Sequence, residues 1–438
     1  MPQPRARDNP ATRAFWNGLE AVAAPVASLL TTAGLVRVLG SQDFGVLVIA
    51  LAISALSLAI NPAIAATTTK FVAEAAAGDQ SAIARIARVI TASAVAIMGL
   101  GLLLVVLTGA CAGPLSRLLF GDALFAARGD LGAILVLAIL SVGIQQLDNV
   151  FAAAIKGLER FKQQAIFELC SRLAVTAAAV GLAWLTHDVR LVLLTMCVML
   201  IFSALLRALL LRHLAPQRRL FARPSRSEVR HLLAFGGWMW LNGAATAAYG
   251  TVDRLIIGRV LGVAAAAQFQ IYVQVSQLIH YVPSNVFAFS FPAFSRLSAG
   301  GMSQRPALER LYRRLLAVIV AIALVLGVAL TLARHPVMGL FAGGGLPAVV
   351  DPALLLLIAG FVLLAINIAP YYLLLGMGKA RSVALVTSLS VLFSIALAWV
   401  LIPRLGIEGA ALGRLGYVLG TLTLLERAHN TLRKSEII

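Results

Sequence analysis

Amide and aromatic side chains recur at helical spacing inside one long apolar segment of the chain. They are Gln270, Gln274, Gln277 and Tyr281. Steps of four, three and four residues place all of them on one face of a helix. Amides hydrogen-bond the hydroxyl groups of a sugar, and they also join helices where lipid offers no partner. This face therefore predicts either sugar contact or interhelical bonding, and His280 beside it predicts either sugar contact or packing.

Arginine occurs inside other apolar segments, where a charge is costly unless it meets a partner or a cavity. These arginines are Arg172, Arg207 and Arg414. A guanidinium group binds phosphate oxygens through two parallel hydrogen bonds, so an anionic ligand is one possible partner. There are also local alternatives. Glu168 precedes Arg172 by four residues and is placed to pair with it, and Arg207 lies close enough to the end of its segment to reach the lipid headgroups.

Carboxylates inside apolar segments form a third set. Glu20, Asp148 and Asp253 are candidates for coupling to protons or sodium ions. Amide side chains close to Asp148 are further candidates for contact with sugar: Gln145, Gln146 and Asn149. No motif predicts a catalytic residue or a bound cofactor. No metal site is predicted either, because the three cysteines are far apart and lack neighbouring histidines.

Membrane-spanning helices must position these residues. Of the 438 residues, 60% are hydrophobic and 12% are charged, and apolar runs near the roughly 20 residues that cross a bilayer recur along the chain. Helices are expected because they satisfy their own backbone in lipid and the runs lack the alternation of barrel strands. Twelve spans are predicted, over residues 15–36, 44–67, 89–110, 131–155, 165–185, 191–211, 232–257, 266–291, 315–332, 352–375, 383–402 and 407–425.

Short repeats predict that the chain consists of two related halves. The segment Arg37-Val-Leu-Gly40 returns as Arg259-Val-Leu-Gly262, at an offset of 259 − 37 = 222 residues. A second set of matched positions has an offset of 376 − 157 = 219: Gly157, Arg160 and Lys162 match Gly376, Lys379 and Arg381. Internal duplication in a membrane chain is typical of transporters, although repeated halves that form only a scaffold remain an alternative.

The predicted domains are a six-helix bundle over residues 1–211, a basic linker over residues 212–231 and a second six-helix bundle over residues 232–438. Basic residues are concentrated at both termini and in alternate loops, which predicts that these parts are cytoplasmic. The net charge of +18 is then mainly a topological signal. Anionic membrane lipids are the expected partners of these loops, and nucleic acid is not.

Four segments of the chain resemble the polysaccharide transporters, or O-antigen flippases, of the multidrug/oligosaccharidyl-lipid/polysaccharide exporter superfamily. They are Arg37–Gly45, Ala66–Glu74, Asp253–Gly262 and Leu405–Gly413. The patterns are loose, but the resemblance covers nearly the whole chain. It implies an all-α integral membrane fold with twelve transmembrane helices. These would form two six-helix bundles around a central cavity, related by a pseudo-two-fold axis along the membrane normal.

The resemblance also implies a function. Such a flippase moves an undecaprenyl-pyrophosphate-linked oligosaccharide across the bacterial inner membrane by alternating access, for the synthesis of O-antigen, capsule or exopolysaccharide. By location, Arg172, Arg207 and Arg414 are the candidates in this chain for contact with the pyrophosphate. A polysaccharide polymerase and glycosyltransferases are the implied protein partners. No enzymatic activity is expected, because flipping a lipid requires no catalysis.

Three other functions compete with this one. A multidrug extruder of the same superfamily also has twelve spans but uses buried carboxylates for cation coupling, and this chain has few. Flippases for peptidoglycan precursors normally have fourteen spans. A glycan polymerase or ligase would carry a large outer loop with catalytic groups, whereas the longest outer loops here, residues 111–130 and 333–351, are short and poor in such residues.

Overall fold

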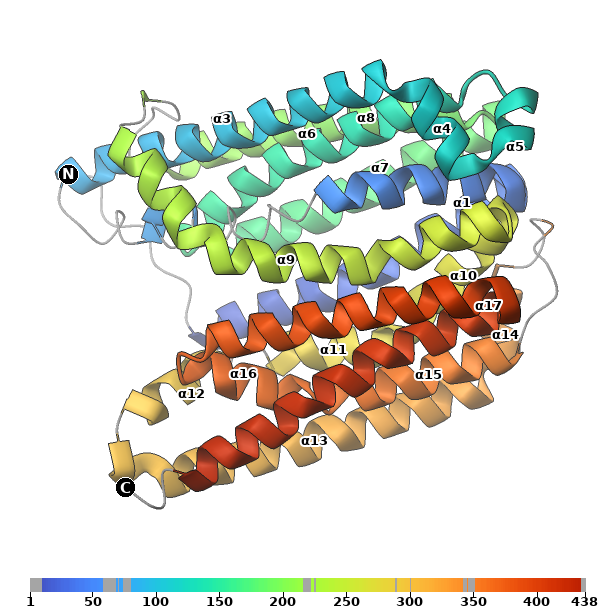
Figure 1. The fold of residues 1–438 in the computed structure, drawn as a ribbon. Coiled ribbons are helices and arrows are strands. Elements are labelled where there is room, and N and C mark those ends of the chain that lie inside the picture. Colours follow the sequence, from blue (N-terminus) through green and yellow to red (C-terminus); the bar gives the residue numbers. More distant parts are fainter. Residues whose placement is uncertain are drawn as a thin grey trace. The chain divides into compact units, whose positions relative to one another are not determined.

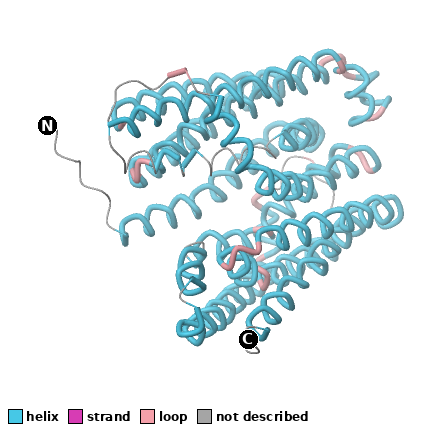
Figure 2. The backbone as a smooth tube through the Cα atoms, turned by 60° about the vertical axis from the view of Figure 1, so that its left-hand side comes forward, coloured by secondary structure: helices cyan, strands magenta, loops and turns pink. Residues whose placement is uncertain are grey.

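The described part of the chain is helical throughout its length, with short turns between helices, in this computed structural model (Figure 2). The structure describes residues 10–57, 68–69, 71–73, 80–215, 222–223, 226–287, 290–299, 301–341, 345 and 351–434. The side chain of Glu20, parts of the predicted second span and parts of the predicted linker lie outside the described residues.

The N-terminal part of the chain contains long helices and two short ones (Figure 1). They are α1 (Pro10–Ser57), α3 (Gln80–Ala110), α4 (Ala112–Phe120), α5 (Asp122–Ala127), α6 (Leu131–Gly157), α7 (Phe161–Thr186), α8 (Val189–Leu214) and α9 (Arg226–Val260). Helices α3, α6, α7 and α8 pack side by side, and α6 is central because it contacts the other three.

Shorter helices alternate with long ones in the C-terminal part. They are α10 (Val263–Ser276), α11 (Leu278–Val286), α12 (Ser290–Ala299), the 3₁₀ turn η3 (Gly301–Gln304), α13 (Arg305–Leu332), α14 (Arg334–Gly339), α15 (Asp351–Ala365), α16 (Ile368–Gly376) and α17 (Ala380–Lys434). Helix α15 contacts α10, α11, α13 and α17, and therefore lies at the centre of this group.

The chain forms two compact units. The first unit comprises residues up to Leu39 together with Ile49–Ala244, and the second comprises Gly40–Val48 together with residues from Ala245 onward. The short segment 40–48, which the sequence places in the first bundle, thus packs within the second unit. There Ser41 Oγ donates a hydrogen bond to the carbonyl oxygen of Gly345. The predicted domain boundaries at residues 211 and 232 stay predictions.

Within the described residues, eight helices are long and apolar enough to cross a membrane. Helix α17 has 55 residues and would extend about 80 Å at 1.5 Å per residue, far more than the roughly 30 Å of a hydrocarbon core. It therefore supplies two spans, separated by non-helical backbone at Gly406. The same argument applies to α1, which has 48 residues and a break at Gly40. These breaks lie where the sequence predicts the ends of spans one and eleven.

The repeated Arg-Val-Leu-Gly segments produce the same turn in both units. Gly40 has φ 79° and ψ 168°, and Gly262 has φ 93° and ψ 166°. A residue with a Cβ atom is strained at such positive φ values, so glycine is required at this turn. The repeat is thus a structural signal that ends one helix and begins the next.

A second turn is also repeated, at the offset of 219 residues. After α6, the amides of residues 158, 159 and 160 bond to the carbonyls of residues 154, 156 and 155. After α16, the amides of residues 377, 378 and 379 bond to the carbonyls of residues 373, 375 and 374. Left-handed backbone occurs at Glu159 (φ 58°) and Gly378 (φ 76°), and again at His187 (φ 52°) and Gly406 (φ 62°). The predicted duplication is confirmed at the level of backbone conformation.

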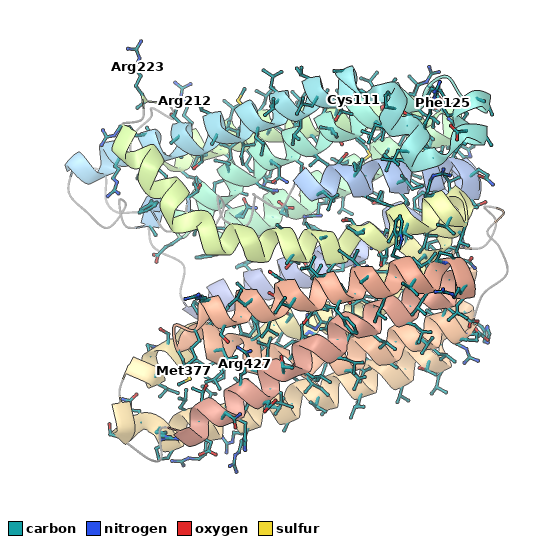
Figure 3. The ribbon with its side chains drawn as sticks, viewed as in Figure 1. Cys111, Phe125, Arg212, Arg223, Met377 and Arg427 are labelled. Carbon is teal, nitrogen blue, oxygen red and sulfur yellow. The ribbon has the colours of Figure 1, made fainter. Side chains whose placement is uncertain are left out.

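The predicted alternation of the helices is visible at the ends of each unit (Figure 3). In the first unit, Arg212 and Arg223 lie at one end, while Cys111 and Phe125 lie at the opposite end. In the second unit, Met377 and Arg427 lie at the same end. Large apolar side chains are exposed along the helices between these ends, as a surface that faces lipid requires: Leu102, Leu103, Val106, Val325 and Val328.

Candidate functional site

Four charged side chains meet inside the first unit and are called the α6–α8 cluster here. Asp148 comes from α6, Glu168 and Arg172 come from α7, and Arg207 comes from α8. These helices pack against one another, so charges on their facing sides are withdrawn from lipid and meet each other. The pair that the sequence spacing allows does form, with Arg172 Nε 2.7 Å from Glu168 Oε1.

Arg207 is the largest fully buried side chain among the described residues and is only 1% exposed. Its Nη2 donates a hydrogen bond to Glu168 Oε2 at 2.8 Å, and its Nε lies 3.0 Å from Asp148 Oδ1. The guanidinium carbon lies 4.7 Å from the centre of the Phe167 ring, a cation–π contact. Arg207 is therefore held by protein groups rather than extended to the lipid headgroups.

The two carboxylates of this cluster are held differently. Glu168 accepts hydrogen bonds from Arg172, Arg207 and Gln164, whereas Asp148 accepts one from Ser203 Oγ at 3.3 Å. The approach of Arg207 Nε to Asp148 Oδ1 is close, but it lacks the geometry of a hydrogen bond, and neither atom has another such partner among the described residues. With all groups ionised, the α6–α8 cluster carries no net charge.

A second group of buried charges lies inside the second unit and is called the α9–α17 cluster here. Arg414 Nε on α17 lies 2.5 Å from Asp253 Oδ2 on α9, and its Nη2 donates to the carbonyl oxygen of Tyr249 at 3.1 Å. Its guanidinium carbon lies 4.6 Å from the Tyr249 ring centre and 5.8 Å from that of Phe269. The Tyr249 ring also stacks on Tyr417 at 4.0 Å.

Arg254 gives the α9–α17 cluster an excess of positive charge. The second oxygen of Asp253, Oδ1, accepts a hydrogen bond from the backbone amide of Arg254 at 2.8 Å. Both oxygens of the carboxylate are thus occupied, and the buried Nε of Arg254 has no hydrogen-bond partner within the part of the chain that the structure describes. Two arginines face one aspartate, so one positive charge remains uncompensated.

The predicted glutamine face lies on a discontinuous helix. Gln270 and Gln274 belong to α10, Gln277 forms the break between α10 and α11, and Tyr281 on α11 is exposed. Gln274 is buried, while Gln270 and Gln277 are half-buried. The half-buried His280 hydrogen-bonds the backbone of Leu364, next to the break between α15 and α16. This contact joins two helices, and a role for these residues in binding sugar stays a prediction.

The amide candidates of α6 lie close to the α6–α8 cluster in sequence. Gln145 and Asn149 are half-buried, whereas Gln146 is buried and neither of its side-chain polar atoms has a partner among the described residues. Within the same described part of the chain, no group of three or more histidine, cysteine or acidic residues is placed to hold a metal ion.

Sequence reasoning missed several members of these sites. The partner of Arg414 is Asp253, which lies 161 positions earlier, so no local spacing indicated it. Tyr249, Phe269 and Arg254 were not predicted as surroundings of Arg414. A buried hydrogen bond from Asn367 Nδ2 to Thr421 Oγ1, which joins α16's N-terminus to α17 at 2.9 Å, was also missed.

Comparison with known proteins gives a family and a fold. A family model described as polysaccharide biosynthesis protein matches residues 12–298. No curated protein matches the chain. Among solved structures, the chain is similar to an inward-facing multidrug resistance MATE family transporter of the MOP superfamily. The TM-score is 0.75 with 15% identity, over 96% of this chain and 99% of that one.

Two further structures show the same likeness. A MATE in complex with MaD3S has a TM-score of 0.67 and 16% identity, over 99% of this chain and 98% of that one. A MOP superfamily transporter from Pyrococcus furiosus, described as having reverse polarity of its binding pocket, has a TM-score of 0.66 and 15% identity, over 98% and 97%. Identities this low show the fold alone. The predicted all-α, membrane-spanning class with the two-lobed architecture of a transporter is thereby confirmed.

Proposed function

Because the chain belongs to the family of polysaccharide biosynthesis proteins within the MOP superfamily of transporters, we propose that it is a lipid-linked oligosaccharide flippase. Its substrate is an undecaprenyl-pyrophosphate-linked oligosaccharide, which it moves across the bacterial inner membrane by alternating access. The product serves the synthesis of a surface polysaccharide such as O-antigen, capsule or exopolysaccharide. Both termini lie in the cytoplasm in this proposal.

The excess positive charge of the α9–α17 cluster is the observation that carries the proposal. Arg254 and Arg414 share a single carboxylate, that of Asp253, deep in apolar helices. An uncompensated guanidinium in such surroundings is costly, and an anionic ligand removes the cost. Guanidinium groups match phosphate oxygens in geometry as well as charge. A pyrophosphate-linked lipid supplies such an anion.

The other parts of the substrate fit the remaining candidates. Arg172 and Arg207 are further proposed contacts for the pyrophosphate, and amide side chains are proposed contacts for sugar: Gln145, Gln146, Asn149, Gln270, Gln274 and Gln277, with His280. The lipid tail stays in hydrocarbon throughout, so the protein has to shield only the polar head. No bond is made or broken, and no catalytic group is required.

A source of energy and several partners belong to the same proposal. Proton or sodium movement through Glu20, Asp148 or Asp253 would drive the cycle. Membrane lipids surround the exposed apolar helices, and a polysaccharide polymerase and glycosyltransferases act before and after translocation.

A cation-coupled multidrug extruder is the second candidate, since the solved structures with the same fold include multidrug transporters. A site for cationic drugs needs an excess of carboxylate. The α9–α17 cluster has the opposite balance, and the α6–α8 cluster is neutral when fully ionised. The charges of the described residues therefore favour an anionic substrate.

The test begins with deletion of the gene in its host, followed by analysis of extracted lipids and of surface polysaccharide. The proposal predicts that an undecaprenyl-linked saccharide accumulates and that the surface polymer is lost. Complementation with Arg254→Gln should lower polymer output about tenfold or more, because a hydrogen bond to a charged group contributes about 1.5–3 kcal/mol. Arg259→Gln, which changes an exposed arginine on the same helix, should restore output fully.

The alternative has its own signature in the same strains. Unchanged lipids and polymer, together with increased sensitivity to cationic drugs, would reject the flippase and support the extruder. Equal complementation by Arg254→Gln and the wild type would reject the role assigned to the α9–α17 cluster.

A further inference from the structure

The two units hold the same buried interhelical contact with different chemistry. Asp148 and Asn367 occupy equivalent positions, each nine residues before its matched glycine, Gly157 or Gly376. Both side chains are buried, and both bond to a hydroxyl on the last long helix of their unit. Asp148 accepts from Ser203, and Asn367 donates to Thr421, which lies one residue from the position equivalent to Ser203.

The other members of the α6–α8 cluster have lost or never had charged counterparts at the same offset. Positions 168, 172 and 207 correspond to Thr387, Val391 and Glu426. Thr387 and Val391 are buried and uncharged, and Glu426 is exposed. The second unit therefore builds the same helix contact with an amide and a hydroxyl. Buried charges are not required to hold this scaffold together.

Charges that the scaffold does not need are expensive to keep, since each buried ion loses its hydration. The α9–α17 cluster obeys the same pattern in reverse, because Asp253, Arg254 and Arg414 correspond to Thr31, Thr32 and Thr195 in the first unit. Each unit is thus charged where the other is neutral. Only the α6–α8 cluster has as many carboxylates as arginines, so a single proton can change the sign of its balance.

We propose that the α6–α8 cluster is a proton-switched anion site, in which Asp148 binds the proton. With Asp148 ionised, the cluster is neutral and offers an anion little attraction. With Asp148 protonated, Glu168 still holds Arg207, and one positive charge is left over. The cluster then has the same excess that the α9–α17 cluster carries permanently.

Asp148 is the switching group because it is the more weakly held carboxylate. Glu168 accepts hydrogen bonds from two arginines, whereas Asp148 has a close approach from Arg207 without hydrogen-bond geometry and one hydroxyl donor. The charged groups that act on Asp148 are Arg207 from α8 and Glu168 and Arg172 from α7. The proton adds to a carboxylate oxygen of Asp148, and no other bond changes.

Proton binding and anion binding must then strengthen each other, because linkage between two sites is reciprocal. The inference rests on the proposed function only for the identity of the anion. A lipid pyrophosphate without sugar, geranylgeranyl pyrophosphate, is a suitable probe. Added to purified protein in a weakly buffered detergent solution, it should draw up to about one proton per protein from the medium. Its affinity should fall by up to about tenfold per pH unit on the alkaline side.

Asp148→Asn copies the side chain that the second unit already uses, so it is expected to fold. It should bind the probe with an affinity that does not change with pH and should draw no proton. Asn367→Asp is the matched control, and its proton uptake on adding the probe should equal that of the wild type. Probe binding without proton uptake in the wild type, or uptake that survives in Asp148→Asn, would overturn the inference and leave the proposed function intact.

Infrared spectroscopy decides about Asp148 without any ligand. On acidification, the wild type should develop the C=O stretch of a protonated carboxyl group, Asp148→Asn should lack this band, and Asp253→Asn should retain it. If the wild type and Asp148→Asn gave the same band, Asp148 would not be the proton-binding group. Failure of the probe to bind the wild type at any pH would count against the proposed function, whereas the infrared result would still decide the inference.

Discussion

Arg414 Nε lies 2.5 Å from Asp253 Oδ2, and this buried ion pair ties the C-terminal half of α17 to α9. Both side chains are less than one-tenth exposed. Removing one partner from such a pair leaves the other charge buried and uncompensated.

Asp253→Asn should therefore lower the free energy of unfolding of the second unit by about 3–5 kcal/mol, because it leaves both Arg254 and Arg414 without a carboxylate. The double variant Asp253→Leu with Arg414→Met removes both charges of the pair and should be more stable than Asp253→Asn. Thermal unfolding in detergent measures the order of stability. A double variant less stable than the single one would show that the pair itself, rather than the orphaned charge, sets the cost.

The close approach of Gly376 to α12 gives a prediction about packing. A Cβ atom at Gly376 would lie 2.8 Å from Phe294 Cβ and 3.0 Å from the backbone nitrogen of Ser295. Gly376→Ala should destabilise the protein by about 1–3 kcal/mol, because the neighbouring helix must shift. Gly181→Ala on α7, where no atom lies within 4 Å of the added Cβ, is the control and should not lower the melting temperature. Equal melting temperatures for the two variants would contradict this packing.

Gly378 separates backbone strain from packing. Its φ is 76°, and no atom lies within 4 Å of a Cβ built there. Gly378→Ala should cost about 1–2 kcal/mol, since left-handed backbone is unfavourable for a residue with a Cβ atom. Chemical denaturation would measure the loss. Wild-type stability in this variant would mean that the turn after α16 does not require left-handed backbone.

Asp130 provides a prediction about pH outside the membrane-spanning helices. The side-chain hydrogen bonds from Arg128, at 3.0 Å to each carboxylate oxygen, lower the pKa of Asp130, although burial acts in the opposite sense. A lowered pKa contributes stability that is present above the unfolded value of about 3.9 and is lost as the pH falls through the folded value. Asp130→Asn should remove this contribution.

The measurement is the drop in melting temperature between about pH 6 and about pH 3, which should be smaller in Asp130→Asn than in the wild type. Asp122→Asn, a change at an exposed acid on α5, is the control and should show the wild-type drop. A drop of wild-type size in Asp130→Asn would mean that the Arg128 contact does not persist in solution.

The spans and the duplication could be predicted from the sequence because both depend on local information. Runs of apolar residues indicate spans, and Gly40 and Gly262 mark identical turns because only glycine fits that backbone. Helix breaks without glycine were harder to predict. Those at Gln277 and at residues 366–367 separate α10 from α11 and α15 from α16, and the flanking helices supply their bonding partners.

The candidate sites could be predicted only in part. The pair of Glu168 and Arg172 follows from a spacing of four residues, and it forms. The partners of Arg207 and Arg414 lie on other helices, and the rotation of each helix about its axis decides which side chains meet. A single sequence contains no signal for that rotation, so the most buried contacts were the least predictable.

The left-handed and glycine turns shared by the two units also carry a historical record. Features present in both copies of a duplicated segment are most simply inherited from the segment before it was copied. Features present in one copy, such as the α6–α8 cluster or the α9–α17 cluster, are most simply later acquisitions. The ancestral six-helix unit then had its turns before it had its buried charges, and specialisation for a substrate came to a scaffold that already folded.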